Sequence, residues 1–196
     1  MPSSSNANQD NQEEKVSLFD EKGKSLACYV EHFLETSDRT YLLLMPVDIP
    51  VSIISWDDDD PDSDDVEAVL LEDDEEISEI FANAKAVLAE LNLYLKHSAY
   101  TLTATGELPP INEEEVLTLG LEDEDEDEDQ DLDSEELQLL ASFYYSGCKY
   151  SIYTPLTPLL FFARYANDGK LELVSPEEEG FQPILEELLF EELEDR

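Results

Sequence analysis

One sequence pattern occurs twice in this chain, 109 residues apart, and it restricts the fold more than any other feature. The first copy, Tyr41–Trp56, reads YLLLMPVDIPVSIISW, and the second, Tyr150–Tyr165, reads YSIYTPLTPLLFFARY. Both copies begin and end with an aromatic residue, and both have proline at the sixth position, Pro46 and Pro155. Runs rich in β-branched and aromatic residues are typical of strands, and proline is typical of a break between them. We therefore expect two related units of similar build.

Two small antiparallel meanders are predicted, one around each copy of the pattern. Around the first copy, strand patterns cover residues 16–20, 25–34, 41–45, 51–56 and 66–71. Around the second copy, they cover residues 137–145, 150–153, 159–165 and 171–174. Residues 135–145 are ambiguous between helix and strand, and comparison with the first copy favours a strand from about Leu137. Between the two units, residues 100–108 and 115–121 are expected to form connecting strands.

Each unit is predicted to end in one helix. Apolar residues recur at helical spacing from Ile77 to Leu95, and the acidic residues 73–76 suit the positive end of the helix dipole. In the second unit, Ser175 and Pro176 form a helix-start signal, and the main helix is expected from about Pro183. The predicted fold class is α+β: two related small antiparallel β-meander-plus-helix units joined by an acidic linker.

The predicted domain boundaries follow from these patterns. They are a disordered tail over 1–14, a first unit over 15–97, connecting strands over 98–121, an acidic linker over 122–133 and a second unit over 134–196.

The charge of the chain is strongly negative, with 51 acidic and 10 basic residues and a formal net charge of −41. Residues 57–65 contain seven Asp in nine positions, and residues 122–133 contain ten acids in twelve. Like charges at this density are expected in a solvated loop and a flexible linker. Such a surface repels nucleic acids and anionic lipids and attracts basic proteins and divalent cations. We therefore expect a basic protein partner and no nucleic-acid partner.

The cysteine content and the apolar runs indicate the kind of compartment. Two cysteines, Cys28 and Cys148, do not make a disulfide framework, so we expect reduced thiols. The first residues show no basic or apolar leader pattern, and the apolar runs are shorter than the roughly 20 residues that cross a bilayer. We expect a cytoplasmic protein without membrane insertion, and the sequence leaves its oligomeric state open.

Several segments carry a resemblance to known families. Val16–Leu26 (VSLFDEKGKSL), followed by a strand and by Tyr41–Pro46 (YLLLMP), resembles the small YrzB-like family of bacterial proteins of unknown function. Ala99–Pro109 (AYTLTATGELP), Leu139–Tyr145 (LLASFYY) and Tyr153–Arg164 (YTPLTPLLFFAR) resemble the second domain of cyanobacterial and chloroplast proteins that begin with a YrzB-like half. The resemblance implies a cyanobacterial cytosol, or the plastid stroma for plant relatives. It implies no activity, cofactor or catalytic residue.

The residue types used in catalysis and metal binding occur here without the spacing that those functions require. An EF-hand loop needs glycine at its sixth position, and neither acidic run contains glycine. A zinc site would need Cys28 and His32 together with residues of the other half, yet on one strand these two lie about 13 Å apart. No phosphate-binding loop and no nucleophile motif is present. We expect no catalytic, cofactor-binding or metal-ligating residues and no cofactor.

The sequence therefore predicts a non-enzymatic acidic interaction or assembly protein that binds a basic protein partner in a photosynthetic cell. The alternatives are a nucleic-acid mimic and a module that responds to divalent cations, and a carboxylate-based enzyme is favoured less. The run 158–165 is apolar on both faces, which suits a buried junction between the units or an exposed partner-binding strand. The residues expected to contact the partner are Phe161, Arg164, Tyr165, Asp57, Asp58, Asp59 and Asp60.

Overall fold

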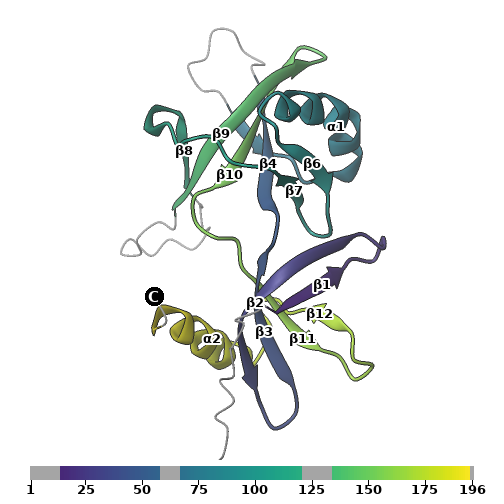
Figure 1. Cartoon of the computed structure of the whole chain (residues 1–196), viewed down its shortest axis with the longest axis vertical. Coiled ribbons are helices and arrows are strands. Elements are labelled where there is room, and N and C mark those ends of the chain that lie inside the picture. Colours follow the sequence, from purple (N-terminus) through teal and green to yellow (C-terminus); the bar gives the residue numbers. More distant parts are fainter. Residues whose placement is uncertain (1–13, 58–66, 121–133, 195–196) are drawn as a thin grey trace, which may run out of the picture.

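Strands from both ends of the chain are mixed in each of two antiparallel sheets, which lie one above the other (Figure 1). The computed structural model describes residues 14–57, 67–120 and 134–194, and the following elements belong to these residues. The lower sheet contains, in order, β1 (Lys15–Phe19), β2 (Ser25–Glu35), β3 (Thr40–Pro46), β11 (Phe161–Tyr165) and β12 (Leu171–Leu173).

The upper sheet is larger, and one edge of its strand β4 is divided between two partner strands. Its order is β6 (Tyr94–His97), β7 (Leu102–Thr105), β4 (Ile49–Asp57), β10 (Cys148–Pro155), β9 (Ser134–Tyr145) and β8 (Val116–Gly120). A further strand, β5 (Glu67–Leu70), also pairs with β4. β10 pairs with residues 52–56 of β4, and Thr154 of β10 also donates a hydrogen bond to the carbonyl of Pro50. One edge of β4 is therefore occupied by β10 from Pro50 onward. Therefore β7 and β5 both pair with the opposite edge of β4, β7 with residues 49–51 and β5 with residues 54–57.

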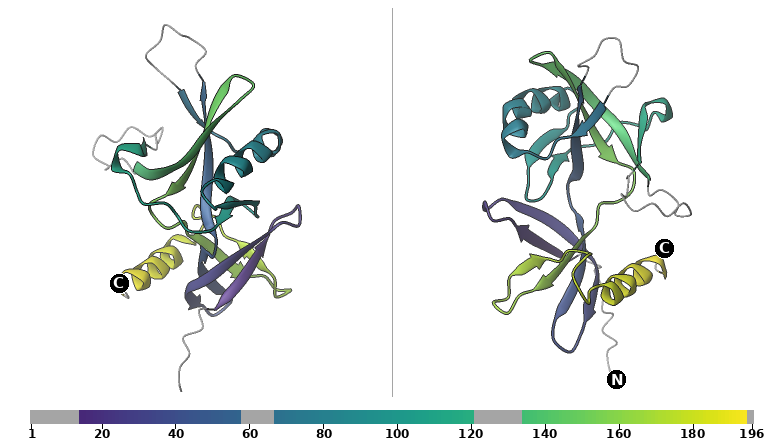
Figure 2. Two further views of the ribbon diagram at one scale, coloured as in Figure 1. Left: turned by 45° about the horizontal axis from the view of Figure 1, so that its top comes forward. Right: turned by 180° about the vertical axis from the view of Figure 1, so that it is seen from behind.

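The two predicted units do not each close their own sheet, and this part of the prediction is wrong. The chain passes from the lower to the upper sheet between β3 and β4, and it returns between β10 and β11 (Figures 1 and 2). As a result β3 pairs with β11 and β4 pairs with β10, so each half of the chain provides strands to both sheets. The predicted α+β class, with mostly antiparallel strands, is confirmed.

The β3–β11 and β4–β10 ladders, which pair strands of the two halves, have the same register. Tyr41 of β3 lies opposite Arg164 of β11, and Tyr150 of β10 lies opposite Ser55 of β4. The offset of 109 residues that relates the sequence copies also relates these partners, and it holds along both ladders.

The β-bulges repeat with the same offset. The β2–β3 register shifts at Glu31, and the β9–β10 register shifts at Leu140. A bulge bends its strand and sharpens the twist. Both sheets therefore bend at matching positions.

The lower sheet curls until β1 and β12 lie next to each other, and it encloses an apolar interior. Buried residues from β1, β2, β3 and β11 fill this interior: Leu18, Leu26, Cys28, Leu42, Leu44 and Ala163. The outer face is covered by α2 (Gln182–Glu194) and the turn before it, where the ring of Phe181 packs 5.6 Å from the rings of Tyr41 and Phe162. The expected start near Pro183 is close to the observed one, whereas Ser175 and Pro176 lie in a turn.

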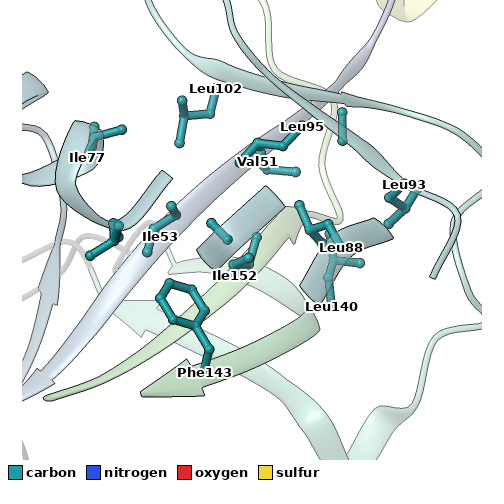
Figure 3. Close-up of a cluster of buried hydrophobic side chains, with 13 residues drawn as sticks. Val51, Ile53, Ile77, Leu88, Leu93, Leu95, Leu102, Leu140, Phe143 and Ile152 are labelled. Atoms are coloured by element: carbon teal, nitrogen blue, oxygen red, sulfur yellow. The ribbon is translucent and has the colours of Figure 1, made fainter. Parts of the chain in front are cut away.

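The upper sheet packs against α1 (Asp74–Ala89), which contacts β9 and β6. Asp73 caps this helix by accepting hydrogen bonds from the backbone N–H groups of Glu75 and Glu76. Figure 3 shows the core that forms below the helix, where apolar side chains from α1, β4, β7, β9 and β10 converge. It includes Val51, Ile53, Ile77, Leu88, Leu102, Leu140, Phe143 and Ile152.

The helix prediction extended too far. The helix ends at Ala89, and Asn92 then takes a left-handed conformation with φ 60°. Leu95, which fits the helical spacing, is instead buried on β6. A tight turn to a new strand therefore replaces the predicted last turns of the helix.

Other predictions fall on residues that are not described. Residues 1–13 of the predicted tail, residues 58–65 of the acidic run and the linker over 122–133 lie outside the described residues. Among the described helices, none is long and apolar enough to cross a membrane.

Candidate functional site

The two sheets meet where the turn between β6 and β7 reaches down to the lower sheet (Figure 1). Ala99 at this turn is fully buried, and its backbone N–H donates a hydrogen bond to the carbonyl of Ser25, 3.2 Å away. The hydroxyl of Tyr100 donates to the carbonyl of Phe19 at 2.8 Å, and its ring packs 6.4 Å from Phe161. The turn thus covers one end of the lower sheet's interior.

A cavity of about 590 Å³ lies beside this contact. It forms at the divided edge of β4, because β7 leaves that edge after Val51 and β5 joins it only at Ile54. The turn between β1 and β2 lines it from the lower sheet, and the start of α1 lines it from the upper sheet. The junction cavity is therefore built from segments that are far apart in the sequence.

A group of charged side chains lies at this cavity. Both Lys22 and Lys24, from the β1–β2 turn, form ion pairs with Asp74 in the first turn of α1. The Nζ of Lys24 is 2.9 Å from Nε2 of His97 on β6. Since an ammonium group only donates, Nε2 of His97 accepts from Lys24 when the imidazole is neutral, and the same nitrogen lies 3.3 Å from Oδ1 of Asp74, with which it pairs when protonated. These contacts connect the two sheets.

The titration of His97 reflects this setting. Partial burial, together with the positive charges of Lys24 and Lys22, lowers the pKa of His97 below its ordinary value of 6.5. Lys24 therefore holds a hydrogen bond to a histidine that stays neutral at pH 7.

The remaining lining combines carboxylates, hydroxyls and apolar side chains. Asp20 accepts hydrogen bonds from the backbone N–H groups of Lys22 and Lys24 and so fixes the turn. Glu21 and Glu72 also line the cavity, are exposed, and pair with none of the described cations. The buried apolar side chains of the lining are Val51, Ile53, Ile77 and Leu102.

The residues predicted to contact a partner are not brought together at this cavity. Phe161 is partly buried and packs against the lower core, whereas Tyr165 is 38% exposed at the end of β11. Asp57 is the last residue of β4, and Asp58, Asp59 and Asp60 lie outside the described residues. Within the run 158–165, only residues 161–164 pair with β3 and so join the two halves, and Ala163 is the one buried residue of the run.

Arg164, the only basic residue between Lys149 and Lys170 in the sequence, forms two ion pairs. Its guanidinium donates to Glu172 at 2.6 Å and to Glu178 at 2.5 Å, and its side chain is 18% exposed. Hydrogen bonds to Glu172 and then to Glu178 raise the pKa of the guanidinium. Arg164 therefore ties β11 to β12 and to the turn that precedes α2.

The possible metal-ligating side chains are not clustered in the described part of the chain. Within residues 14–57, 67–120 and 134–194, no three His, Cys, Asp or Glu side chains are placed to hold a metal ion. Cys28 is fully buried, and burial raises the pKa of its thiol to about 11, which makes it an unreactive core residue. Cys148 is exposed and free.

Sequence reasoning missed the junction cavity. Lys22 and Lys24 fit a hairpin turn around Gly23, and His97 fits the end of a predicted helix. One available signal was that two of the ten basic residues flank a single glycine in a very acidic chain. That signal indicates a basic turn, but it does not indicate that the turn pairs with the carboxylate of Asp74.

Comparison with known families matches two adjacent parts of the chain. The family described as "Protein of unknown function (DUF3727)" matches residues 92–192, and that described as "Protein of unknown function (DUF1292)" matches residues 21–89. No curated protein and no solved structure matches the chain. Each matched part provides strands to both sheets.

Proposed function

The chain belongs to the family described as "Protein of unknown function (DUF3727)", and we propose that it acts without catalysis, by binding a basic protein partner through its acidic surface. The family spans residues 92–192, about half of the chain, and includes β6 to β12 and most of α2. Because the family description names no activity, the proposal depends on the charge and the surface of this chain.

The observation that supports it is the position of carboxylates on the outer faces of both described helices. Glu75, Glu76 and Glu79 on α1 are exposed, and so are Glu186 and Glu187 on α2. The opposite faces of these helices are buried against the sheets. The carboxylates are therefore held on ordered elements and point to solvent.

Fixed charges of one sign act on a partner before contact. A net charge of −41 attracts a basic protein over several ångströms, and complementary charge raises the rate of association more than the final affinity. Salt screens this attraction with a Debye length of about 8 Å at physiological ionic strength. Binding of the basic partner is thus expected to weaken as salt is added.

The setting and origin of the protein are parts of the same proposal. The sequence resemblance supports a photosynthetic cell, in the cyanobacterial cytosol or the plastid stroma. We also infer that the two halves are related units that have exchanged their last elements. The first half places β4, β5 and α1 with β8, β9 and β10 of the second half, and the second half places β11, β12 and α2 with β1, β2 and β3 of the first half. The common offset of 109 residues in both exchanged ladders and at both bulges supports this relation.

An affinity capture experiment tests the proposal. Tagged protein is incubated with a cyanobacterial lysate at low and at high salt, and the retained proteins are identified and quantified. We expect a basic protein to be retained in stoichiometric amount at low salt and largely lost at high salt. If no basic protein is retained at low salt, the proposal fails.

Two charge variants show whether the helix carboxylates contribute. Glu186→Gln/Glu187→Gln neutralises the outer face of α2, and Glu113→Gln/Glu114→Gln makes the same charge change in the short turn before β8. We expect the α2 variant to retain several-fold less partner than the control, because its carboxylates are held on a packed helix. Equal retention would assign the attraction to total charge alone.

A further inference from the structure

We propose that the junction cavity receives a lysine or arginine side chain of the basic partner. The inference rests on the proposed function and adds to it a defined contact point with a defined chemistry. The cavity is the place where the two sheets, α1 and the β1–β2 turn meet around one concave surface.

The dimensions and walls of the cavity suit a long amphipathic side chain. Ligand cavities commonly measure about 300–1,000 Å³, and this one measures about 590 Å³. Leu70 and Tyr100, which are 46% and 48% exposed, are apolar residues of its lining against which an aliphatic stem can pack. Lysine and arginine combine such a stem with a charged head that stays near polar groups.

The charges at the cavity favour a cation over an anion. Four carboxylates line it, from Asp20, Glu21, Glu72 and Asp74, against the ammonium groups of two lysines and a neutral histidine. The net charge of the whole chain repels anions before they reach the cavity. The charges that line the cavity and the net charge of the whole chain therefore both favour a cationic ligand.

The chain itself places an alkylammonium group in this site. Lys22 comes from the β1–β2 turn of the lower sheet, and its ammonium binds Asp74 at the start of α1 while its side chain stays 64% exposed. Glu21 and Glu72 have no such cation among the described residues. An incoming basic side chain can pair with these carboxylates or replace the exposed Lys22 at Asp74.

The cavity also marks the place where the two halves differ. The strands β6 and β7 have no counterpart on the lower sheet among the described residues, where β11 pairs with β12 alone on the matching edge. His97, Thr101 and Leu102 of this insertion line the cavity. The insertion therefore gives the upper sheet a binding surface that the lower sheet does not share.

Small probes test the class of ligand directly on the full-length protein. Nα-acetyl-arginine amide and Nα-acetyl-lysine amide are titrated, with acetate as the anionic probe, and amide chemical shifts of His97 and Thr101 are followed by NMR. We expect saturable shifts with the two cationic probes and none with acetate. Shifts with acetate alone, or no shift with the cationic probes, would overturn the inference.

Two pairs of variants separate the cavity from the general field. Glu21→Gln/Glu72→Gln is expected to weaken probe binding about tenfold, whereas Glu113→Gln/Glu114→Gln, with the same net charge, leaves it unchanged. Lys22→Ala is expected to strengthen binding several-fold, because it removes one of the two ammonium groups that pair with Asp74, whereas Lys149→Ala has no such effect. Weaker binding in Lys22→Ala than in Lys149→Ala would contradict a cation site.

An arginine-rich peptide and free spermidine complete the experiment. If the peptide binds the native protein and Glu113→Gln/Glu114→Gln more tightly than Glu21→Gln/Glu72→Gln, the cavity is the contact point. Equal binding to all three overturns the inference and leaves the proposed function intact, whereas no binding to any removes both. Tighter binding of spermidine than of the peptide would assign the site to a free polyamine and overturn a partner side chain as its occupant.

Discussion

His97 shows how one side chain at the junction responds to its neighbours. It accepts a hydrogen bond from Lys24, 2.9 Å away, and its pKa in the folded protein lies below 6.5. Below pH 6.5 the unfolded chain binds this proton more readily than the folded chain does. The stability linked to His97 is therefore present above pH 6.5 and is lost as pH falls from 6.5 through the lower, folded pKa.

The variant His97→Gln tests this sign, because its amide oxygen can still accept from Lys24 but does not titrate. We expect the native protein to lose more stability than the variant between pH 8 and pH 5, measured by urea unfolding at each pH. Comparing the two proteins removes the contribution of the many carboxylates, which they share. A parallel loss in both would contradict the lowered pKa of His97.

Gly106 is a glycine at which a side chain has no room. Its φ is 137°, and a Cβ would lie 2.5 Å from the carbonyl oxygen of Asn92. We expect Gly106→Ala to lower the free energy of unfolding by about 2 kcal/mol or more. Gly169→Ala, at φ 80° with no atom within 4 Å of its Cβ, is the control and is expected to cost about 1 kcal/mol. Equal losses in thermal or urea unfolding would contradict the close contact.

At the scale of elements, the local strand patterns were largely predictable and the partners were not. The predicted strands at 25–34, 41–45 and 51–56 correspond to β2, β3 and β4, because alternation and β-branched residues act within one segment. The exchange of β4 for β11 depends on pairing between residues more than 90 positions apart, which no local pattern records. Leu95 misled the helix prediction because its spacing continues that of Leu88, while the left-handed Asn92 between them has no strong sequence signal.

The candidate site was predictable only in its acidic character. Tyr165 and Arg164 lie on β11 as expected, but the junction cavity combines two turns, a helix start and the middle of a strand. Each of these segments has an ordinary local pattern. Their meeting is set by the long-range pairing and could not be derived from the sequence.

The packing of α2 on the lower sheet gives a prediction for this element. Leu188 is fully buried between the helix and the sheet, whereas Phe190, two residues later, is 62% exposed. We expect Leu188→Ala to lower the free energy of unfolding by about 2–4 kcal/mol and Phe190→Ala by less than about 0.5 kcal/mol. Urea unfolding followed by circular dichroism measures both. A small effect of Leu188→Ala would show that α2 does not stabilise the sheet.

At the scale of the whole molecule, the mixed sheets predict that the described part of the chain unfolds in one step. If either half of the chain unfolds, both sheets lose interior strands, because β3 pairs with β11 and β4 with β10. Trp56 reports on the upper sheet, and hydrogen exchange at Leu42 and Ala163 reports on the lower sheet. We expect the same midpoint from both in urea. Two separate midpoints would indicate independent units.

The exchanged order of strands also affects how the protein is made on the ribosome. The edge of β3 that β11 later covers is synthesised more than 100 residues before its partner, so nascent chains expose an open strand edge for much of translation. Open edges join neighbouring chains unless charge keeps them apart. The acidic residues that follow β4 are translated during this interval, and their mutual repulsion gives the unfinished chain protection from aggregation before any partner is present.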